Sequence, residues 1–269
     1  MLMARKTNKY PYLLLLVIHT ALLLFVFSKQ PKKRGLLALL LSNMGFAFIF
    51  DYIVVSFFPG YRYRPKVLKN KYFDNILGAT LSQAVYVPFT AVSISGLRLG
   101  WGAKLLFSLY FSIIEKLFIH LGLFKRKWWK TRFTFMLIPF FFFISDVRWK
   151  GLREGNKTMK ALCLYNMMHM TWVNGVFILE VYRLIRFGIG KNYKWQEQMK
   201  MVPAYGMVYG AIGTAVALKN KWSLKALLFG VVLIMDKILI KLGLMKVYSM
   251  FPLTMVHIVA ILSNPSVSW

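Results

Sequence analysis

Cysteine and acidic residues are scarce in this chain of 269 residues. The single cysteine, Cys163, excludes an internal disulfide and a cysteine-rich metal site. Asp and Glu together number only 8, too few for the acid-rich clusters that hold Mg²⁺ in lipid-phosphate enzymes. The 4 histidines form no pair at the helical spacing typical of metal or haem ligands. We therefore expect no metal and no cofactor.

Charged residues make up only 16% of the chain, whereas 58% of the residues are hydrophobic and 17% are aromatic. Soluble proteins average about 45–50% apolar and roughly 25% charged residues. A globular fold could not bury so much apolar surface, and disordered chains are poor in such residues. The composition therefore predicts an all-α protein, a polytopic bundle of transmembrane helices.

Basic residues dominate the charge that is present. Lys and Arg number 36, so the formal net charge is +28. They gather in short clusters between apolar runs, and no basic segment is long enough to form a nucleic-acid-binding domain. Such clusters are typical of loops at lipid headgroup level, where they favour anionic lipids as partners. The two clearest clusters are Lys32, Lys33 and Arg34, and Lys125, Arg126 and Lys127.

Hydropathy predicts about nine spans. The first follows basic residues but precedes no good cleavage site, so we interpret it as a retained helix. The basic loops favour a cytoplasmic N-terminus in a cell membrane, most simply the bacterial cytoplasmic membrane. The predicted spans are Pro11–Ser28, Leu36–Phe58, Ile76–Leu97, Gly102–Phe124, Phe133–Val147, Met159–Tyr182, Met201–Leu218, Leu224–Leu244 and Tyr248–Ser263.

An internal repeat is the most informative signal. Trp101–Lys125 aligns without gaps on Trp222–Lys246, with 10 of 25 positions identical and Glu115 matched by Asp236. The shared pattern is W-x2-K-x10-[ED]-K-x2-I-x-L-G-L-x-K. The same offset also matches Tyr61-Arg62 with Tyr182-Arg183. Apolar composition alone would not produce matched Trp, Lys, Gly and acidic positions.

The repeat predicts two parallel four-helix units and one extra helix. The first unit would cover residues 1–131, the second residues 132–247, and the terminal span and tail residues 248–269. An even number of spans per unit inserts both units the same way up, which implies a pseudo-two-fold axis along the membrane normal.

The repeated unit resembles a group of small, uncharacterised multi-span membrane proteins of spore-forming Firmicutes. The resemblance lies in Glu115-Lys116, in Leu121-Gly122-Leu123 with Lys125, and in Trp128-Trp129-Lys130. The chain would be a tandem duplicate of such a protein, although Val247-Tyr248-Ser249 replaces the double Trp in the second unit. The resemblance implies no activity.

Polar residues inside the predicted spans are the candidate site. Glu115 with Lys116, and Asp236 with Lys237, lie at equivalent depths near the middle of their spans. Each acid is either clamped to a lysine between helices or part of an ion, proton or substrate site. Further candidates share helix faces by their i, i+4, i+8 spacing: Asn43 and Asp51 in the first unit, and Asn166 and Asn174 in the second. His169 lies on the same face as these two asparagines, which favours an inter-helix hydrogen-bond cluster.

Enzyme signatures such as a Gly-rich phosphate loop, H-E-x-x-H, C-x-x-C and a nucleophile elbow are absent from the sequence. The leading hypothesis is a non-enzymatic helical bundle whose polar interior acts on a small solute or ion. The alternative is a structural or regulatory membrane protein, connected to sporulation, that binds anionic lipid or partner proteins. A membrane enzyme acting on lipid or polyprenyl substrates is a third possibility.

Overall fold

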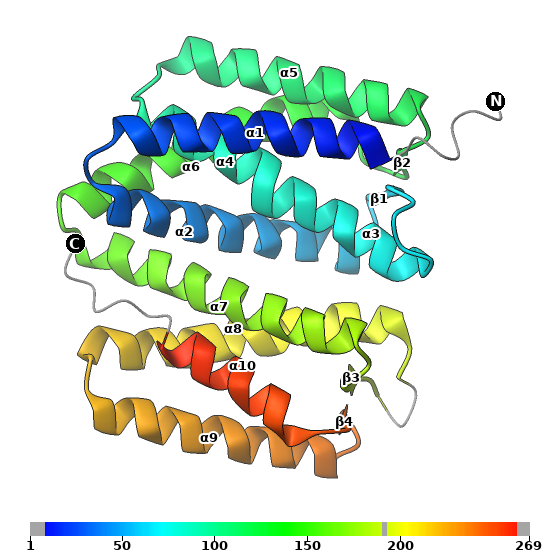
Figure 1. Ribbon diagram of the computed structural model, residues 1–269, viewed down its shortest axis with the longest axis vertical. Coiled ribbons are helices and arrows are strands. Elements are labelled where there is room, and N and C mark those ends of the chain that lie inside the picture. Colours follow the sequence, from blue (N-terminus) through cyan, green and yellow to red (C-terminus); the bar gives the residue numbers. More distant parts are fainter. Residues whose placement is uncertain (1–8, 190–192, 263–269) are drawn as a thin grey trace. The chain divides into compact units, whose positions relative to one another are not determined.

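The computed structural model describes residues 9–189 and 193–262 (Figure 1). Residues 1–8, with Arg5 and Lys6 of the predicted cytoplasmic N-terminus, and residues 263–269 of the predicted tail lie outside the described residues. The chain forms two compact units, residues 1–156 and 157–269. Continuous helices dominate both units, and the described residues form nine of them.

The first unit contains six α-helices, of which α3 and α4 belong to one continuous helix, and a short two-stranded ribbon. Its elements in order are α1 (Lys9–Lys29), α2 (Lys33–Asp51), β1 (Tyr61–Tyr63), α3 (Lys71–Thr80), α4 (Val87–Gly96), α5 (Trp101–His120), β2 (Phe124–Arg126) and α6 (Thr131–Arg153). A π-helical turn over Tyr52–Phe57 extends α2, and another over Leu81–Tyr86 joins α3 to α4. Such turns are rare and occur frequently at functional sites.

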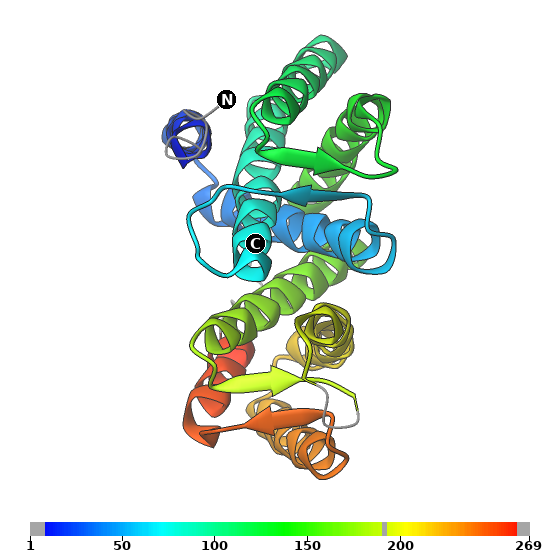
Figure 2. The ribbon, with the colours of Figure 1, turned by 90° about the vertical axis from the view of Figure 1, so that its right-hand side faces the viewer.

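The second unit repeats much of this order with four helices. Its elements are α7 (Lys157–Val181), β3 (Ile185–Phe187), α8 (Trp195–Lys219), α9 (Trp222–Lys241), β4 (Met245–Val247) and α10 (Met250–Leu262). In both units the ribbon crosses one end of the helices (Figure 2). The sequence did not reveal these three-residue strands, which lie in predicted loops or at the ends of predicted spans.

Five helical segments are long and apolar enough to cross a membrane: Lys9–Lys29, Lys33–Phe57, Lys71–Gly96, Lys157–Val181 and Glu197–Lys219. They coincide with the first, second, third, sixth and seventh predicted spans, and they confirm the class of the protein as helical and suited to a membrane. The fourth and eighth predicted spans are α5 and α9, which carry the repeated charges of the W-x2-K-x10-[ED]-K pattern. The predicted fifth span is α6, with Asp146 and Arg148 in its second half, and the ninth is the 13-residue α10.

The boundary between the compact units, after residue 156, lies later in the chain than the predicted repeat boundary between residues 131 and 132. Helix α6 lies beyond that boundary, yet it packs against α2, α4 and α5 in the first unit. Helix α10, predicted as a separate terminal span, packs against α7 and α9 in the second unit. Chain connectivity explains this packing. Helices α6 and α10 begin a few residues after the second strand of their ribbons, and each packs against the helix before that strand, α5 or α9.

Most of the shared sequence pattern has a structural explanation. Lys104 Nζ lies 4.7 Å from the Trp101 ring centre, and Lys225 Nζ lies 4.7 Å from that of Trp222, so the W-x2-K positions form a cation–π pair at the start of each helix. The glycines of the L-G-L segments end α5 and α9.

Gly122 and Gly243 both have a φ of 70°, the left-handed conformation that favours glycine. The backbone N–H of Leu123 donates to Phe118 O, and that of Leu244 donates to Leu239 O. This is the hydrogen-bonding pattern of a Schellman motif, which stops each helix and turns the chain into its strand.

Both ribbons bury apolar side chains, and the ribbon of the first unit presents basic side chains outward. In the first unit Tyr61 and Phe124 are buried, whereas Arg62 and Lys125 are exposed and directly opposite each other. In the second unit Arg186 lies opposite Lys246. Arg62 at the centre of β1 thus corresponds to Arg186 at the centre of β3. The sequence alignment instead matches Tyr61-Arg62 with Tyr182-Arg183.

Gly243→Ala should lower the free energy of unfolding by about 1 kcal/mol, because a Cβ disfavours the left-handed backbone. Gly230→Ala in the middle of α9 is the matched control, since a Cβ at either position meets no atom within 4 Å. The control should raise stability by roughly 0.5–1 kcal/mol. Unfolding midpoints in detergent measure both, and equal shifts in the two variants would contradict the Schellman assignment.

Candidate functional site

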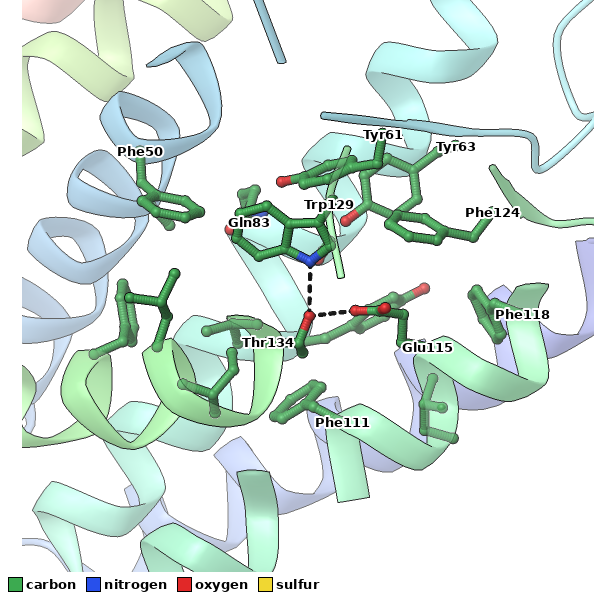
Figure 3. Close-up of a pocket in the computed structure, with 18 of the residues that line it drawn as sticks. Phe50, Tyr61, Tyr63, Gln83, Phe111, Glu115, Phe118, Phe124, Trp129 and Thr134 are labelled. Carbon is green, nitrogen blue, oxygen red and sulfur yellow. Dashed lines mark hydrogen bonds between the residues drawn. The ribbon is translucent and has the colours of Figure 1, made fainter. Parts of the chain in front are cut away.

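A cavity of about 340 Å³ lies beneath the ribbon of the first unit, and helices α1, α2, α5 and α6 and the π-helical turn Leu81–Tyr86 contribute to its wall (Figure 3). Ligand sites in proteins have volumes of about 300–1,000 Å³. The wall is mainly aromatic, with rings from Tyr12, Phe46, Phe50, Tyr61, Tyr63, Tyr86, Phe111, Phe118, Phe124, Trp129, Phe140 and Phe141.

Glu115 is the only lining residue with an ionisable carboxyl or basic group. It is half-buried, and its carboxylate accepts hydrogen bonds from the hydroxyls of Thr131, at 2.7 Å, and of Thr134. Trp129 Nε1 donates to Thr134 Oγ1 at 2.9 Å. Trp129, Thr134 and Glu115 therefore form a donor chain that ends on the carboxylate at the cavity wall (Figure 3).

Asp51 anchors the ribbon above the cavity. The Tyr61 hydroxyl donates to Asp51 Oδ1 at 2.7 Å, and Gln83 Nε2 reaches the same oxygen at 3.4 Å. Burial and the nearby Asp51 carboxylate raise the pKa of Tyr61 well above its usual value, and the same two causes raise the pKa of Tyr63. Both phenols therefore stay neutral, so Glu115 supplies the formal charge of the wall.

The segment between β1 and α3 is held by side chain to backbone hydrogen bonds. The Asp74 carboxylate accepts from the backbone N–H groups of Lys66, Val67 and Leu68 at 2.8–3.0 Å. Asn75 Oδ1 accepts from the backbone N–H of Tyr63 at 2.7 Å. These bonds fix the position of β1, and with it the Tyr61 and Tyr63 rings that cover the cavity.

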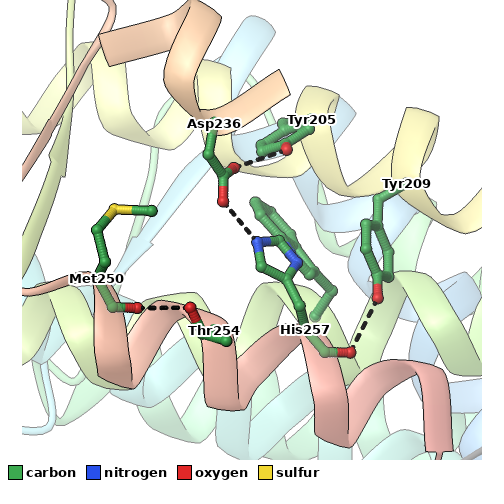
Figure 4. Close-up of polar contacts among 7 residues, drawn as sticks. Tyr205, Tyr209, Asp236, Met250, Thr254 and His257 are labelled. Atoms are coloured by element: carbon green, nitrogen blue, oxygen red, sulfur yellow. Dashed lines mark hydrogen bonds and ion pairs between the residues drawn. The ribbon is translucent and has the colours of Figure 1, made fainter. Parts of the chain in front are cut away.

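The equivalent acid of the second unit lies in a different environment (Figure 4). Asp236 is fully buried, with Oδ1 accepting from the Tyr205 hydroxyl at 2.9 Å and Oδ2 lying 2.8 Å from His257 Nε2. Trp172 Nε1, which can only donate, lies 3.3 Å from His257 Nδ1. His257 Nδ1 is therefore the acceptor and Nε2 carries the proton that it donates to Asp236.

Neither acid is paired with a lysine among the residues that the structure describes. Lys116 and Lys237 are exposed, whereas the preceding acids face the interior of their units. Glu115 and Asp236 thus contact hydroxyl and imidazole groups, and not the lysines that the clamp interpretation predicts. The two acids occupy equivalent positions in the repeated pattern, but they belong to separate compact units and have separate partners.

The remaining predicted polar residues fall into separate groups. Asn43 bonds to Ser145 and accepts from Arg148, while Asp51 belongs to the ribbon anchor. Asn174 donates to the Met170 carbonyl within its own helix. Asn166 and His169 are buried in α7, where His169 packs against glycines of α8, Gly206 and Gly210.

A buried polar network in the first unit was missed by the sequence analysis. Lys104 is 4% exposed and lies 2.5 Å from Asp146 Oδ2, and Ser95 donates to the other Asp146 oxygen at 2.7 Å. Ser95 also bonds to Ser145, which connects this network to Asn43. The repeated Lys104 was a usable signal, whereas Asp146 was overlooked in the short fifth span.

All six residues predicted to face lipid headgroups are exposed: Lys32, Lys33, Arg34, Lys125, Arg126 and Lys127.

No family model, curated protein or solved structure matches this chain.

Tyr205→Phe should lower the free energy of unfolding by about 1.5–3 kcal/mol, because it removes a hydrogen bond to a buried carboxylate. Tyr209→Phe is the matched control. The Tyr209 hydroxyl donates to the backbone carbonyl of His257 at 3.3 Å, so its loss should cost only about 0.5–1.5 kcal/mol. Denaturant titration in detergent measures both variants, and a larger loss for Tyr209→Phe would contradict the assigned network.

Proposed function

We propose that the chain is an integral membrane protein whose first unit binds a small, largely apolar solute in the aromatic cavity. The observation that carries the proposal is the cavity itself, with its volume of about 340 Å³ and its aromatic wall. Ligand sites combine apolar walls with a few well-placed polar groups, and Glu115 with its threonine partners fits that description.

The proposed role is non-enzymatic, as a carrier or receptor of the solute in a cell membrane with the N-terminus in the cytoplasm. Two observations besides the cavity support a binding role. The π-helical turn Leu81–Tyr86 contributes Ser82, Gln83 and Tyr86 to the wall, and such turns often mark functional sites. Asp74 and Asn75 also hold the covering strand in a defined position.

We also propose that the two units arose by duplication and that the first retained the binding site. Both units contain a long helix, a strand, a second long helix, a third helix that begins with a Trp–Lys pair, a second strand and a final helix. Under this proposal α2 corresponds to α7, α5 to α9 and α6 to α10, and α1 is the additional helix.

The cavity proposal predicts that filling the space abolishes binding of a small neutral probe. Ala47 is buried and lines the cavity, so Ala47→Phe should occupy part of its volume. Equilibrium dialysis with tert-butylbenzene, on protein in zwitterionic lipid nanodiscs with empty nanodiscs subtracted, should show saturable binding by the original protein and little by the variant.

The matched control is Ala103→Phe, the same substitution at a half-buried position of α5 that does not line the cavity. It should leave binding unchanged. Equal binding by the Ala47→Phe variant would place the probe elsewhere, and absence of saturable binding by the original protein would contradict the proposal.

Binding of anionic lipid is a second proposed role, supported by the ribbons. Arg62 lies opposite Lys125, and Arg186 lies opposite Lys246. Like charges directly across an antiparallel pair are destabilising, so an anionic phosphate on the outer face would relieve the repulsion between Arg62 and Lys125, which are both exposed. Each basic side chain near an anionic surface contributes about 1 kcal/mol.

The double variant Arg62→Gln/Lys125→Gln should therefore retain less phosphatidylglycerol after purification than the original protein. The control variant Lys219→Gln/Lys221→Gln removes the same charge from the exposed turn between α8 and α9. This variant should retain more phosphatidylglycerol than the ribbon variant. Lipid extraction and mass spectrometry measure the retained phosphatidylglycerol relative to phosphatidylcholine. Equal retention of both lipids by the original protein would count against this role.

A further inference from the structure

We infer that the solute bound in the first unit is an organic cation, an amine or quaternary ammonium attached to an apolar body. The inference rests on the proposed function and adds the chemical class of the ligand. The cationic head would lie at the Glu115 carboxylate, and the apolar body would lie against the surrounding rings.

The charge of the cavity favours a cation. Glu115 is the only lining residue with a formal charge, because the tyrosines are neutral. Its partners in the described part of the chain are the uncharged hydroxyls of Thr131 and Thr134. Arg126 Nη1 donates to Thr131 Oγ1 at 3.3 Å, so this exposed guanidinium reaches the carboxylate only through that hydroxyl, and solvent screens its charge. A carboxylate oxygen can accept more than one hydrogen bond. A cationic ligand in the cavity would make the direct contact with Glu115 that Arg126 does not make.

The rings of the wall favour the same ligand. Aromatic faces attract ammonium groups, and quaternary ammonium ligands are commonly held in cages of such rings. Tyr63 and Phe124 lie 5.1 Å apart at their ring centres, and Tyr61 and Trp129 lie 5.4 Å apart. Figure 3 shows these four rings on the side of the cavity next to the ribbon.

Phe46 contributes less to this attraction, because the Arg148 guanidinium already lies 4.3 Å from its ring centre. A bare metal ion fits the cavity poorly. Ca²⁺ requires six to eight oxygen ligands and Mg²⁺ requires a near-octahedral set. The wall around Glu115 consists mainly of carbon.

The matching acid of the second unit shows how the surroundings of Glu115 differ. Asp236, the matching acid, receives one hydrogen bond from Tyr205 and another from the imidazole of His257. That imidazole projects from α10, which follows the ribbon as α6 does in the first unit. At Glu115 both donors are threonine hydroxyls of the segment at the start of α6, and the space in front of the carboxylate is cavity. In the first unit a ligand in the cavity can therefore contact the carboxylate directly, whereas no such space is open to Asp236, which is fully buried.

The test compares phenyltrimethylammonium with tert-butylbenzene, a pair of the same shape that differs in charge. Equilibrium dialysis on the full chain in zwitterionic nanodiscs should give at least about tenfold tighter binding of the cation, the scale of a partly desolvated cation–π and ion-pair contact. Glu115→Gln keeps an oxygen that can accept from the threonines and removes the charge. It should abolish the preference for the cation while binding of tert-butylbenzene persists.

Glu154→Gln is the matched control, because Glu154 is an exposed carboxylate at the end of α6, where it pairs only loosely with Lys150 at 4.0 Å. It should leave both affinities unchanged. Should Glu115→Gln fail to fold, Phe124→Leu provides the second variant. It keeps an apolar side chain in the wall, and it should weaken binding of the cation several-fold more than that of its isostere.

Equal affinity of the original protein for the two compounds would overturn the inference and leave the proposed solute site standing. An unchanged cation preference in Glu115→Gln, or in Phe124→Leu where only that variant folds, would also overturn it. Failure of both compounds to bind the original protein would overturn the proposed function as well.

Discussion

A carboxylate inside an apolar helical bundle must be hydrogen-bonded, because an unpaired charge there is too costly to keep. Both units of this protein place an acid at the same position of the second continuous helix after their first strand, and each meets the requirement differently. The second unit surrounds Asp236 with Tyr205 and His257 and buries it completely. The first unit satisfies Glu115 with two threonine hydroxyls and leaves a cavity beside it. Helix α6 supplies both threonines and α10 supplies His257, whereas Tyr205 lies on α8.

The apolar runs of the sequence were enough to predict the helices, because length and hydropathy constrain a membrane helix strongly. Three-residue strands carry no comparable signal, and their pairing joins segments far apart in the chain, such as Tyr61–Tyr63 with Phe124–Arg126. The L-G-L segments could have indicated the ends of α5 and α9, since a glycine after a helix commonly adopts a positive φ. As a marker of the repeat alone, that glycine does not predict the ribbon that begins just after it.

The acids were found from their depth in apolar helices, but their partners were not. A lysine adjacent to an acid in the sequence points to a different side of the helix, because consecutive residues are separated by about 100° around the axis. Lys116 and Lys237 are therefore exposed, while the acids face inward. The true partners, Thr134 for Glu115 and His257 for Asp236, lie on the helix after the second strand. Predicting them requires the path of the chain through the ribbon, which three-residue strands do not reveal.

Under the proposed function, the different environments of Glu115 and Asp236 divide the protein into a scaffold and a binding site. A buried network such as Tyr205–Asp236–His257 stabilises its unit only when each member has its partner, and this leaves no capacity for a ligand. The Glu115 carboxylate is held by two hydroxyls and borders the cavity, so a ligand in the cavity can contact it directly. Under the proposed function, the second unit therefore serves as a scaffold, and the solute is recognised in the first unit, whose acid lies beside the cavity.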